Sequence, residues 1–382
     1  MDKETLSNYG WIVILVLILA VMIALATPFG NFVSEAIKST TAGLFTTNQN
    51  ALGAAGIAIP GQEFADTNVE NVELVGEAYA IYTDSDKTLR FIRSEEEPVA
   101  GDEYNGITIT KVYSGIETAE YEWHCTDDGT FGNVPWVNDY SRNIKHVIFV
   151  DTVKPIKTDG WFAEFYYCET FDIAKLDTSD VTSMYCMFIY AGAYTDNFYL
   201  NVAHFDTSKV QDNMGFMFGY VGQNATTFEL VGLENFDTSN INSMYNMFQS
   251  AGASAQTFKL NLTGWDMSNV HNAHTMFSGA GYNSQIFEII GLDYWDVSSL
   301  ESADDMFNSA GYNATNWSIG NLSNWKLSSI RYMAEMFRNA GKNANYVLDL
   351  SAWKDEVYDV TGEYGNKNFA YGVEDKIITP WE

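Results

Sequence analysis

Aspartate recurs at nearly regular intervals between residues 177 and 296, and a serine follows two residues after each one. The aspartates are Asp177, Asp206, Asp237, Asp266 and Asp296. If the intervals are stacked repeats, these side chains form a ladder with a spacing of about 5–10 Å. Such a ladder of carboxylates can ligate Ca²⁺. We favour the alternative, in which each carboxylate accepts hydrogen bonds from the backbone amides of its own corner.

Two histidines have a spacing that would suit a metal site. His271 and His274 would share one face of a helix, and Glu301 or Asp304 occupies comparable positions one repeat later. Imidazole and carboxylate groups are common zinc ligands, but we interpret all four as solvated residues. His124 and Cys125 would point to opposite faces of a strand, so we do not expect them to form a nucleophile and its base.

No motif in the chain indicates catalysis. A glycine loop for phosphate, a nucleophile elbow and a zinc-protease helix are all missing from the sequence. The three cysteines, Cys125, Cys168 and Cys186, have no metal-ligand spacing and are compatible with one disulfide and a free thiol. We therefore predict a protein that is not an enzyme, with no catalytic, metal-binding or cofactor-binding residues.

A repeat of about 30 residues organises residues 170–353. The segment 236–241, Phe-Asp-Thr-Ser-Asn-Ile, is a typical copy. A Met-Phe pair follows in each repeat, at 187–188, 217–218, 247–248, 276–277, 306–307 and 336–337. The copies drift toward the end, as expected for terminal repeats that cover the stack.

Each repeat combines two periodicities. Four apolar residues have the spacing of one face of a helix of two to three turns: Met244, Met247, Phe248 and Ala251. Gly252 is placed where a left-handed residue would end that helix, and residues 258–260 alternate as in a short strand. We therefore predict an α+β solenoid resembling leucine-rich repeats, with a short strand and a short helix per coil and a core of Met and aromatic residues.

The segments around the array have a different character. Residues 72–169 predict a β-rich capping domain, with a hairpin at 77–82 and 88–93 and further strands at 107–113 and 145–151. Residues 40–71 are interpreted as a linker. Residues 354–382 are interpreted as a C-terminal cap.

The N-terminal segment, residues 1–39, predicts a transmembrane anchor helix. Residues 11–26 are an unbroken apolar run within an uncharged stretch, 5–34, long enough to cross a bilayer core of about 30 Å. The alternative is a cleaved signal peptide, since Ala24-Leu25-Ala26 has the form of a cleavage site. We favour a retained anchor because Asp2 and Glu4 offset Lys3.

Composition restricts the partners. A formal net charge of −30 makes nucleic acid a poor partner, and a hydrophobic content of 46% provides for a large core. An acidic surface of this kind favours solubility.

The copies at 205–210 and 236–241, each followed by its Met-x-x-Met-Phe segment, resemble the BspA-like bacterial surface-protein repeat, also described as the DUF285 or Mycoplasma-lipoprotein-type leucine-rich repeat. The resemblance extends over roughly residues 75–353 and includes the hairpin and the Trp161-Phe162 pair. It implies a non-enzymatic bacterial cell-surface protein that binds host, matrix or neighbouring-cell macromolecules. The period is longer here than in the commoner form of the family.

We therefore expect a single-pass protein of the bacterial cell membrane, contacting the bilayer through its N-terminal helix. Its extracellular acidic solenoid would serve as an adhesion scaffold for protein or glycan partners. The alternative is a pilin-like structural subunit that assembles through the same helix, because residues 5–50 have a remote similarity to small Flp-type pilins.

Overall fold

The computed structural model describes residues 74–126, 129–357, 360 and 365–381, all within the second of the chain's two units, Glu73–Glu382. The predicted anchor and linker, 1–39 and 40–71, lie outside the described residues. Among the residues described, no helix combines the length and the apolar character needed to cross a bilayer.

The N-terminal part of this unit is built on a five-stranded sheet with the order β5-β1-β2-β8-β9. Its strands are β1 (Glu77–Thr83), β2 (Thr88–Ser94), β5 (Lys111–Tyr113), β8 (His146–Phe149) and β9 (Thr170–Asp172). The antiparallel β1–β2 pair confirms the predicted hairpin. The strand expected at 107–113 is divided between β4 (Ile107–Thr108), which pairs with β3 (Glu103–Tyr104), and β5.

Two smaller elements lie beside this sheet. The hairpin of β6 (Trp123–Thr126) and β7 (Gly129–Gly132) is antiparallel. The short helix α3 (Pro135–Tyr140) begins with a proline at its first turn. The indole nitrogen of Trp136 in α3 donates to the carbonyl of Trp161 at 2.7 Å, which fixes the helix to the core.

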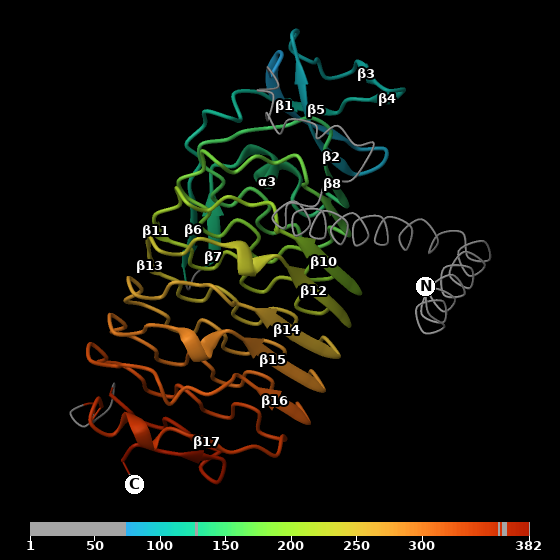
Figure 1. The fold of residues 1–382 in the computed structure, drawn as a ribbon. Coiled ribbons are helices and arrows are strands. Elements are labelled where there is room, and N and C mark those ends of the chain that lie inside the picture. The colour runs from blue at the N-terminus through green and yellow to red at the C-terminus, as the bar shows by residue number, and fades with distance from the viewer. Residues whose placement is uncertain (1–73, 127–128, 358–359, 361–364, 382) are drawn as a thin grey trace, which may run out of the picture. The chain divides into compact units, whose positions relative to one another are not determined.

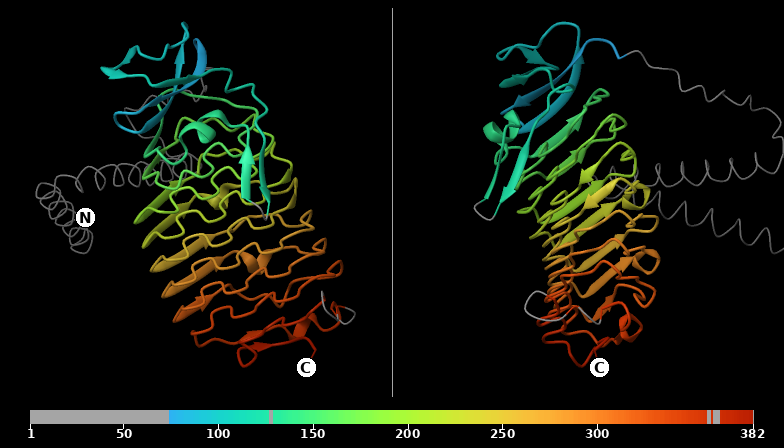
Figure 2. Two further views of the ribbon diagram at one scale, coloured as in Figure 1. Left: turned by 180° about the vertical axis from the view of Figure 1, so that it is seen from behind. Right: turned by 90° about the vertical axis from the view of Figure 1, so that its left-hand side faces the viewer.

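From β9 onward the chain forms a β-solenoid of about six turns, in which β8 and β9 already run parallel (Figure 1). Successive coils contribute one strand each to one side of the stack, as Figure 2 shows from behind. These strands are β10 (Asn197–Asn201), β12 (Thr227–Val231), β14 (Thr257–Asn261), β15 (Ile286–Ile290) and β16 (Asn316–Ser318), with β17 (Leu348–Asp349) and β18 (Ile377–Ile378) at the end.

Inward side chains form three ladders of aromatic rings through the coils. The first contains Phe162, Phe188, Phe218, Phe248, Phe277, Phe307 and Phe337, with ring centroids 5.1 to 5.7 Å apart. The second lies on the strands and contains Phe198, Phe228, Phe258, Phe287 and Trp317. The third contains Phe205, Phe236, Trp265, Trp295, Trp325 and Trp353. This confirms the predicted core, in which the methionines of residues 170–353 are also buried.

The predicted helix in each coil is wrong. Residues 244–252 form consecutive tight turns, in which the amide of Met247 bonds the carbonyl of Met244 within the coil while the amide of Phe248 bonds the carbonyl of Met276 in the next coil. Asn246 (φ 58°) and Ser250 (φ 52°) are left-handed, which a helix does not permit. Carbonyl groups of the adjacent coil thus accept from alternate amides, whereas in a helix carbonyl groups of the same segment would have to do so.

Gly252 is left-handed as predicted, with φ 52°, although it ends a run of turns. A Cβ at this position would lie 2.8 Å from the ring of Phe228, so glycine lets the chain pass closely over the strand aromatics.

Two shorter strands complete the coils: β11 (Asp212–Asn213) pairs with β13 (Ile241–Ser243). Single-turn 3₁₀ segments η1 (Leu233–Asn235), η2 (Leu292–Tyr294) and η3 (Ser351–Trp353) form corners.

The strand ladder is interrupted between β9 and β10, between β12 and β14 and between β16 and β17. Among the described residues, β12 pairs with β10, and β14 pairs with β15, but β12 and β14 do not pair with each other. The amide of Gln256 still bonds the carbonyl of Thr226 at 3.0 Å just before the strands, and Phe228 still stacks on Phe258 at 5.4 Å. The coils are therefore held together here by side chains and by their other edges.

Candidate functional site

The aspartate ladder has the local role that we favoured. The Oδ1 atom of each aspartate accepts a hydrogen bond from the amide two residues later, at 2.9 to 3.0 Å, on Ser179, Ser208, Ser239, Ser268 and Ser298. The side-chain and backbone hydrogen bonds from Ser208 lower the pKa of Asp206, and those from Ser298 lower the pKa of Asp296. These carboxylates close the corners of the coils.

Three of the four residues considered for a second metal site have other partners, and Glu301 Oε2 lies 4.0 Å from Arg331 Nε. His271 Nδ1 lies 2.7 Å from the carbonyl oxygen of Asn269. The carboxylate of Asp304 accepts from the amide of Ala334 at 2.8 Å and from the hydroxyl of Ser302 at 3.1 Å, and burial raises its pKa. Within the described ranges, no three His, Cys, Asp or Glu residues are grouped so as to hold a metal ion.

The cysteines differ in state. Cys186 is disulfide-bonded, and Cys168 is a buried free thiol whose pKa is raised by burial. His124 lies in β6 as expected for a strand. The side chain of Cys125 lies outside the described residues.

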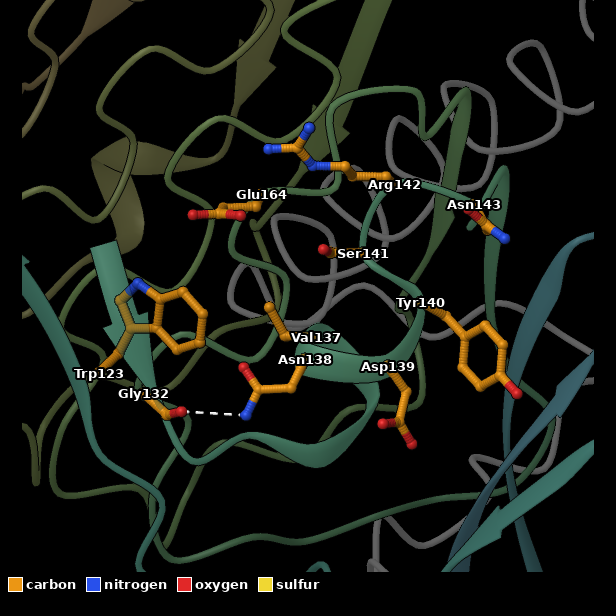
Figure 3. A pocket seen from close by; sticks show the side chains of 10 residues that line it. All are labelled: Trp123, Gly132, Val137, Asn138, Asp139, Tyr140, Ser141, Arg142, Asn143 and Glu164. Atoms are coloured by element: carbon orange, nitrogen blue, oxygen red, sulfur yellow. Dashed lines mark hydrogen bonds between the residues drawn. The ribbon is translucent and has the colours of Figure 1, made fainter. Parts of the chain in front are cut away.

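The sequence did not indicate a pocket of about 420 Å³ beside α3 (Figure 3). It is lined by residues from three places: β6 and β7, the helix α3 with the loop after it, and the turn at Glu164. The lining residues are Trp123, Gly132, Val137, Asn138, Asp139, Tyr140, Ser141, Arg142, Asn143 and Glu164. Most of them are polar.

Local hydrogen bonds fix several of these groups. Asn138 Nδ2 donates to the carbonyl of Gly132 at 3.0 Å, which ties α3 to β7. Asp139 Oδ2 accepts from the hydroxyl of Tyr113 at 3.0 Å. The amide of Asn143 bonds the carbonyl of Tyr140 at 2.8 Å, so the loop after α3 is a defined turn.

Trp123 forms one wall of the pocket and is only 3% exposed. Its ring lies against two glycines: a Cβ on Gly132 would come within 2.3 Å of it, and one on Gly160 within 2.5 Å. Its indole nitrogen is buried without a hydrogen-bond partner. Figure 3 shows this nitrogen on the side of the ring toward Glu164.

A row of tyrosines begins at the rim of the pocket, and we call it the tyrosine row. Its members are Tyr166, Tyr167, Tyr190, Tyr194 and Tyr220. Tyr166 lies 5.5 Å from Tyr190 and 5.2 Å from Tyr194, and Tyr190 stacks on Tyr220 at 4.5 Å. The guanidinium of Arg142, which lines the pocket, lies 5.5 Å from the ring centroid of Tyr166. Tyr194 is 54% exposed and Tyr167 is 39% exposed.

The tyrosine row was also missed from the sequence, although the repeat contains a signal. The coil-to-coil hydrogen bonds align Tyr190 and Tyr220 with Ser250, Gly279 and Ser309 in later coils. Stacking of the solenoid therefore does not require tyrosine at this position. The change from tyrosine to small residues at this position is one of many differences between the copies, so the sequence alone did not single it out.

These features define a class of protein: a β-solenoid with an aromatic core, corners closed by aspartate and a polar pocket beside its first coils. Within this class, the chain belongs to the family described as "Mycoplasma protein of unknown function, DUF285", whose model matches residues 159–289 and 253–368. The match confirms the resemblance found in the repeats. No curated protein and no solved structure matched the chain.

Proposed function

We propose that the protein is a non-enzymatic binding scaffold, with the solenoid as an adhesion surface. The observation that supports this proposal most directly is the contrast between the two faces of the strands. Inward positions repeat Phe198, Phe228 and Phe258, which are all buried. The next outward position changes from coil to coil, and contains Tyr199, Glu229, Lys259, Glu288 and Ser318.

Such a surface suits recognition of an extended partner. Adjacent strands place successive outward side chains about 4.8 Å apart, and each coil can vary its outward residue without disturbing the aromatic core. Outward charges pair across coils, as in Lys259 Nζ to Glu288 Oε2 at 2.8 Å and Lys209 Nζ to Asp180. Exposed pairs contribute little stability, so these positions remain free to change for a partner.

We further propose that the solenoid is displayed outside a bacterial cell and tethered to the membrane through residues 1–39. The apolar run at 11–26 and membership of the family support this proposal. The partners would be host, matrix or neighbouring-cell macromolecules. Nucleic acid is disfavoured by the net charge of −30.

An attachment assay tests the proposal. Native cells that lack the protein should attach less to matrix-coated or cell-coated surfaces, and the full-length chain should restore attachment. Replacing the outward strand residues Tyr199, Glu229, Lys259 and Glu288 by serine, the residue already present at Ser318, should leave the full-length chain in the membrane fraction but reduce attachment. Equal attachment by this variant and by wild type would contradict the scaffold. Purification of the full chain as filaments would favour the pilin-like alternative.

A further inference from the structure

We propose that the pocket beside α3, extended by the tyrosine row, binds a neutral oligosaccharide. This inference rests on the proposed scaffold function and gives it a site and a ligand class. The pocket volume of about 420 Å³ falls in the range of about 300–1,000 Å³ typical of small-molecule sites. It would hold one or two sugar rings, and the row would contact the rings that follow.

The polar lining complements sugar hydroxyls. A hydroxyl both donates and accepts, so it is best bound by carboxylates and amides together. Asp139 and Glu164 supply acceptors, Asn143 supplies a donor and an acceptor, and Arg142 supplies only donors. Asp139 retains capacity although Oδ2 accepts from Tyr113 and pairs with Lys111, because a carboxylate offers about four lone-pair sites.

Trp123 provides a second observation that indicates a ligand. A buried indole N–H without a partner is unfavourable, and native proteins usually satisfy such a donor. Here the donor belongs to a ring that lines the pocket and lies against two glycines. Figure 3 shows the nitrogen on the side of the ring toward Glu164, so a ligand hydroxyl held between Trp123 and Glu164 would accept from this donor.

The charges select a neutral ligand. The pocket contains two carboxylates, Asp139 and Glu164, and one guanidinium, Arg142, while Lys111 Nζ lies 3.5 Å from Asp139 Oδ2. The charges at the site therefore balance, which suits a neutral ligand, and the net charge of −30 over the whole chain disfavours an anionic sugar. The guanidinium of Arg142 lies over the ring of Tyr166, an arrangement in which its in-plane N–H groups can donate to hydroxyl or ring oxygens.

The tyrosine row extends this site along the first coils. Stacking holds the rings in place, so little conformational entropy is lost when a ligand binds. Apolar ring surface can contact the C–H groups of a sugar, while the phenol groups bond its hydroxyls. Positions equivalent to Tyr190 and Tyr220 carry Ser250, Gly279 and Ser309 in the next three coils, so the tyrosine row itself ends near the pocket. The later Tyr282–Tyr312 pair lies at a different position of the repeat.

A protein partner is the rival occupant, because Tyr and Arg are also common in protein interfaces. The concave pocket with two carboxylates and two asparagines favours the sugar, since charged residues are depleted at the core of protein interfaces. Screening and titration with neutral oligosaccharides distinguish a sugar ligand from a protein partner.

The test uses the full-length protein in a detergent without a sugar headgroup, since a glycosidic detergent would compete. The protein is screened against immobilised neutral oligosaccharides, and the best one is titrated by calorimetry. We expect saturable binding that Arg142→Ala and Tyr190→Ser each weaken at least tenfold. Tyr190→Ser should fold, because Ser250 occupies the equivalent position in the next coil but one.

The matched control is Tyr312→Ser. Tyr312 stacks on Tyr282 at 4.8 Å in later coils, away from the pocket residues, so its loss should leave affinity unchanged. Thermal unfolding checks that all variants are folded. Absence of binding to every neutral oligosaccharide, or equal affinity of Arg142→Ala and Tyr312→Ser, would overturn the proposal. Attachment that persists in either case would show that the scaffold function stands without this ligand.

Discussion

The hydroxyl of Thr238 makes two hydrogen bonds to the backbone of Asp266 in the next coil. It donates to the Asp266 carbonyl at 2.9 Å and accepts from the Asp266 amide at 2.8 Å. Thr178 does the same for Asp206. In later coils Met267, Val297 and Leu327 are buried at the matching position. At this corner of the coil, therefore, polar bonds join the first coils and apolar packing replaces them in the later ones.

Thr238→Val should destabilise the protein by about 1–3 kcal/mol, because it leaves the amide and carbonyl of Asp266 without these partners at nearly unchanged volume. Urea unfolding measures the change. Ser239→Ala, which removes an exposed bond to Asp237, is the control and should stay within about 0.5 kcal/mol of wild type. Equal effects of the two substitutions would show that the Thr238 bonds between coils contribute nothing.

Two aspartates should give opposite pH dependences. Bonds from Ser208 lower the pKa of Asp206, whereas burial raises the pKa of Asp159 despite its bonds from Ser183 and Tyr185. The contribution of Asp206 is therefore present above its unfolded pKa, about 3.9, and is lost as the pH falls through its folded pKa. The contribution of Asp159 is present below about pH 3.9 and is lost as the pH rises through its folded pKa.

Urea unfolding between pH 3 and pH 7 checks these signs. The wild-type advantage over Asp206→Asn should shrink on acidification. The wild-type advantage over Asp159→Asn should shrink as the pH rises. Parallel curves for wild type and either variant would contradict the assignment for that residue.

The cysteines should react differently with an alkylating reagent. Cys168 is 1% exposed and burial raises its pKa, so it should be unreactive in the native state and react after unfolding. Cys186 should react only after unfolding and reduction, because it is disulfide-bonded. Peptide mapping by mass spectrometry measures both. Labelling of Cys186 without a reductant would disprove the disulfide.

Hydrogen exchange should detect the missing pairing between β12 and β14. Residues 257–261 in β14 lack pairing with β12, whereas β15 pairs on both sides, with β14 and β16. Exchange in 257–261 should therefore be faster than in 286–290. Equal protection of the two strands would mean that β12 and β14 pair in solution.

The repeat and its core could be predicted from the sequence because the burial pattern is periodic. Met244, Met247, Phe248 and Ala251 are all fully buried, as their spacing indicates. The same spacing does not identify a helix, since turns with a left-handed residue at Asn246 and Ser250 also direct these four inward. The alternate amides bond carbonyl groups of the adjacent coil, and this pairing is visible only in the folded structure.

The candidate site could not be predicted from the sequence, because its residues belong to different elements. Trp123, Asn143 and Glu164 come from separate elements that only the fold brings together around the pocket. The aspartate corners were predictable because each involves only an amide two residues away.

The central claim, an outward-facing binding surface, is tested most directly by lysine labelling of intact native cells with a membrane-impermeant reagent. Lys209, Lys259 and Lys326 have side chains that are 56%, 54% and 70% exposed. We predict that peptide mapping finds all three modified to the same extent on intact cells as after permeabilisation. Modification only after permeabilisation would place the solenoid inside the cell and contradict the adhesion scaffold.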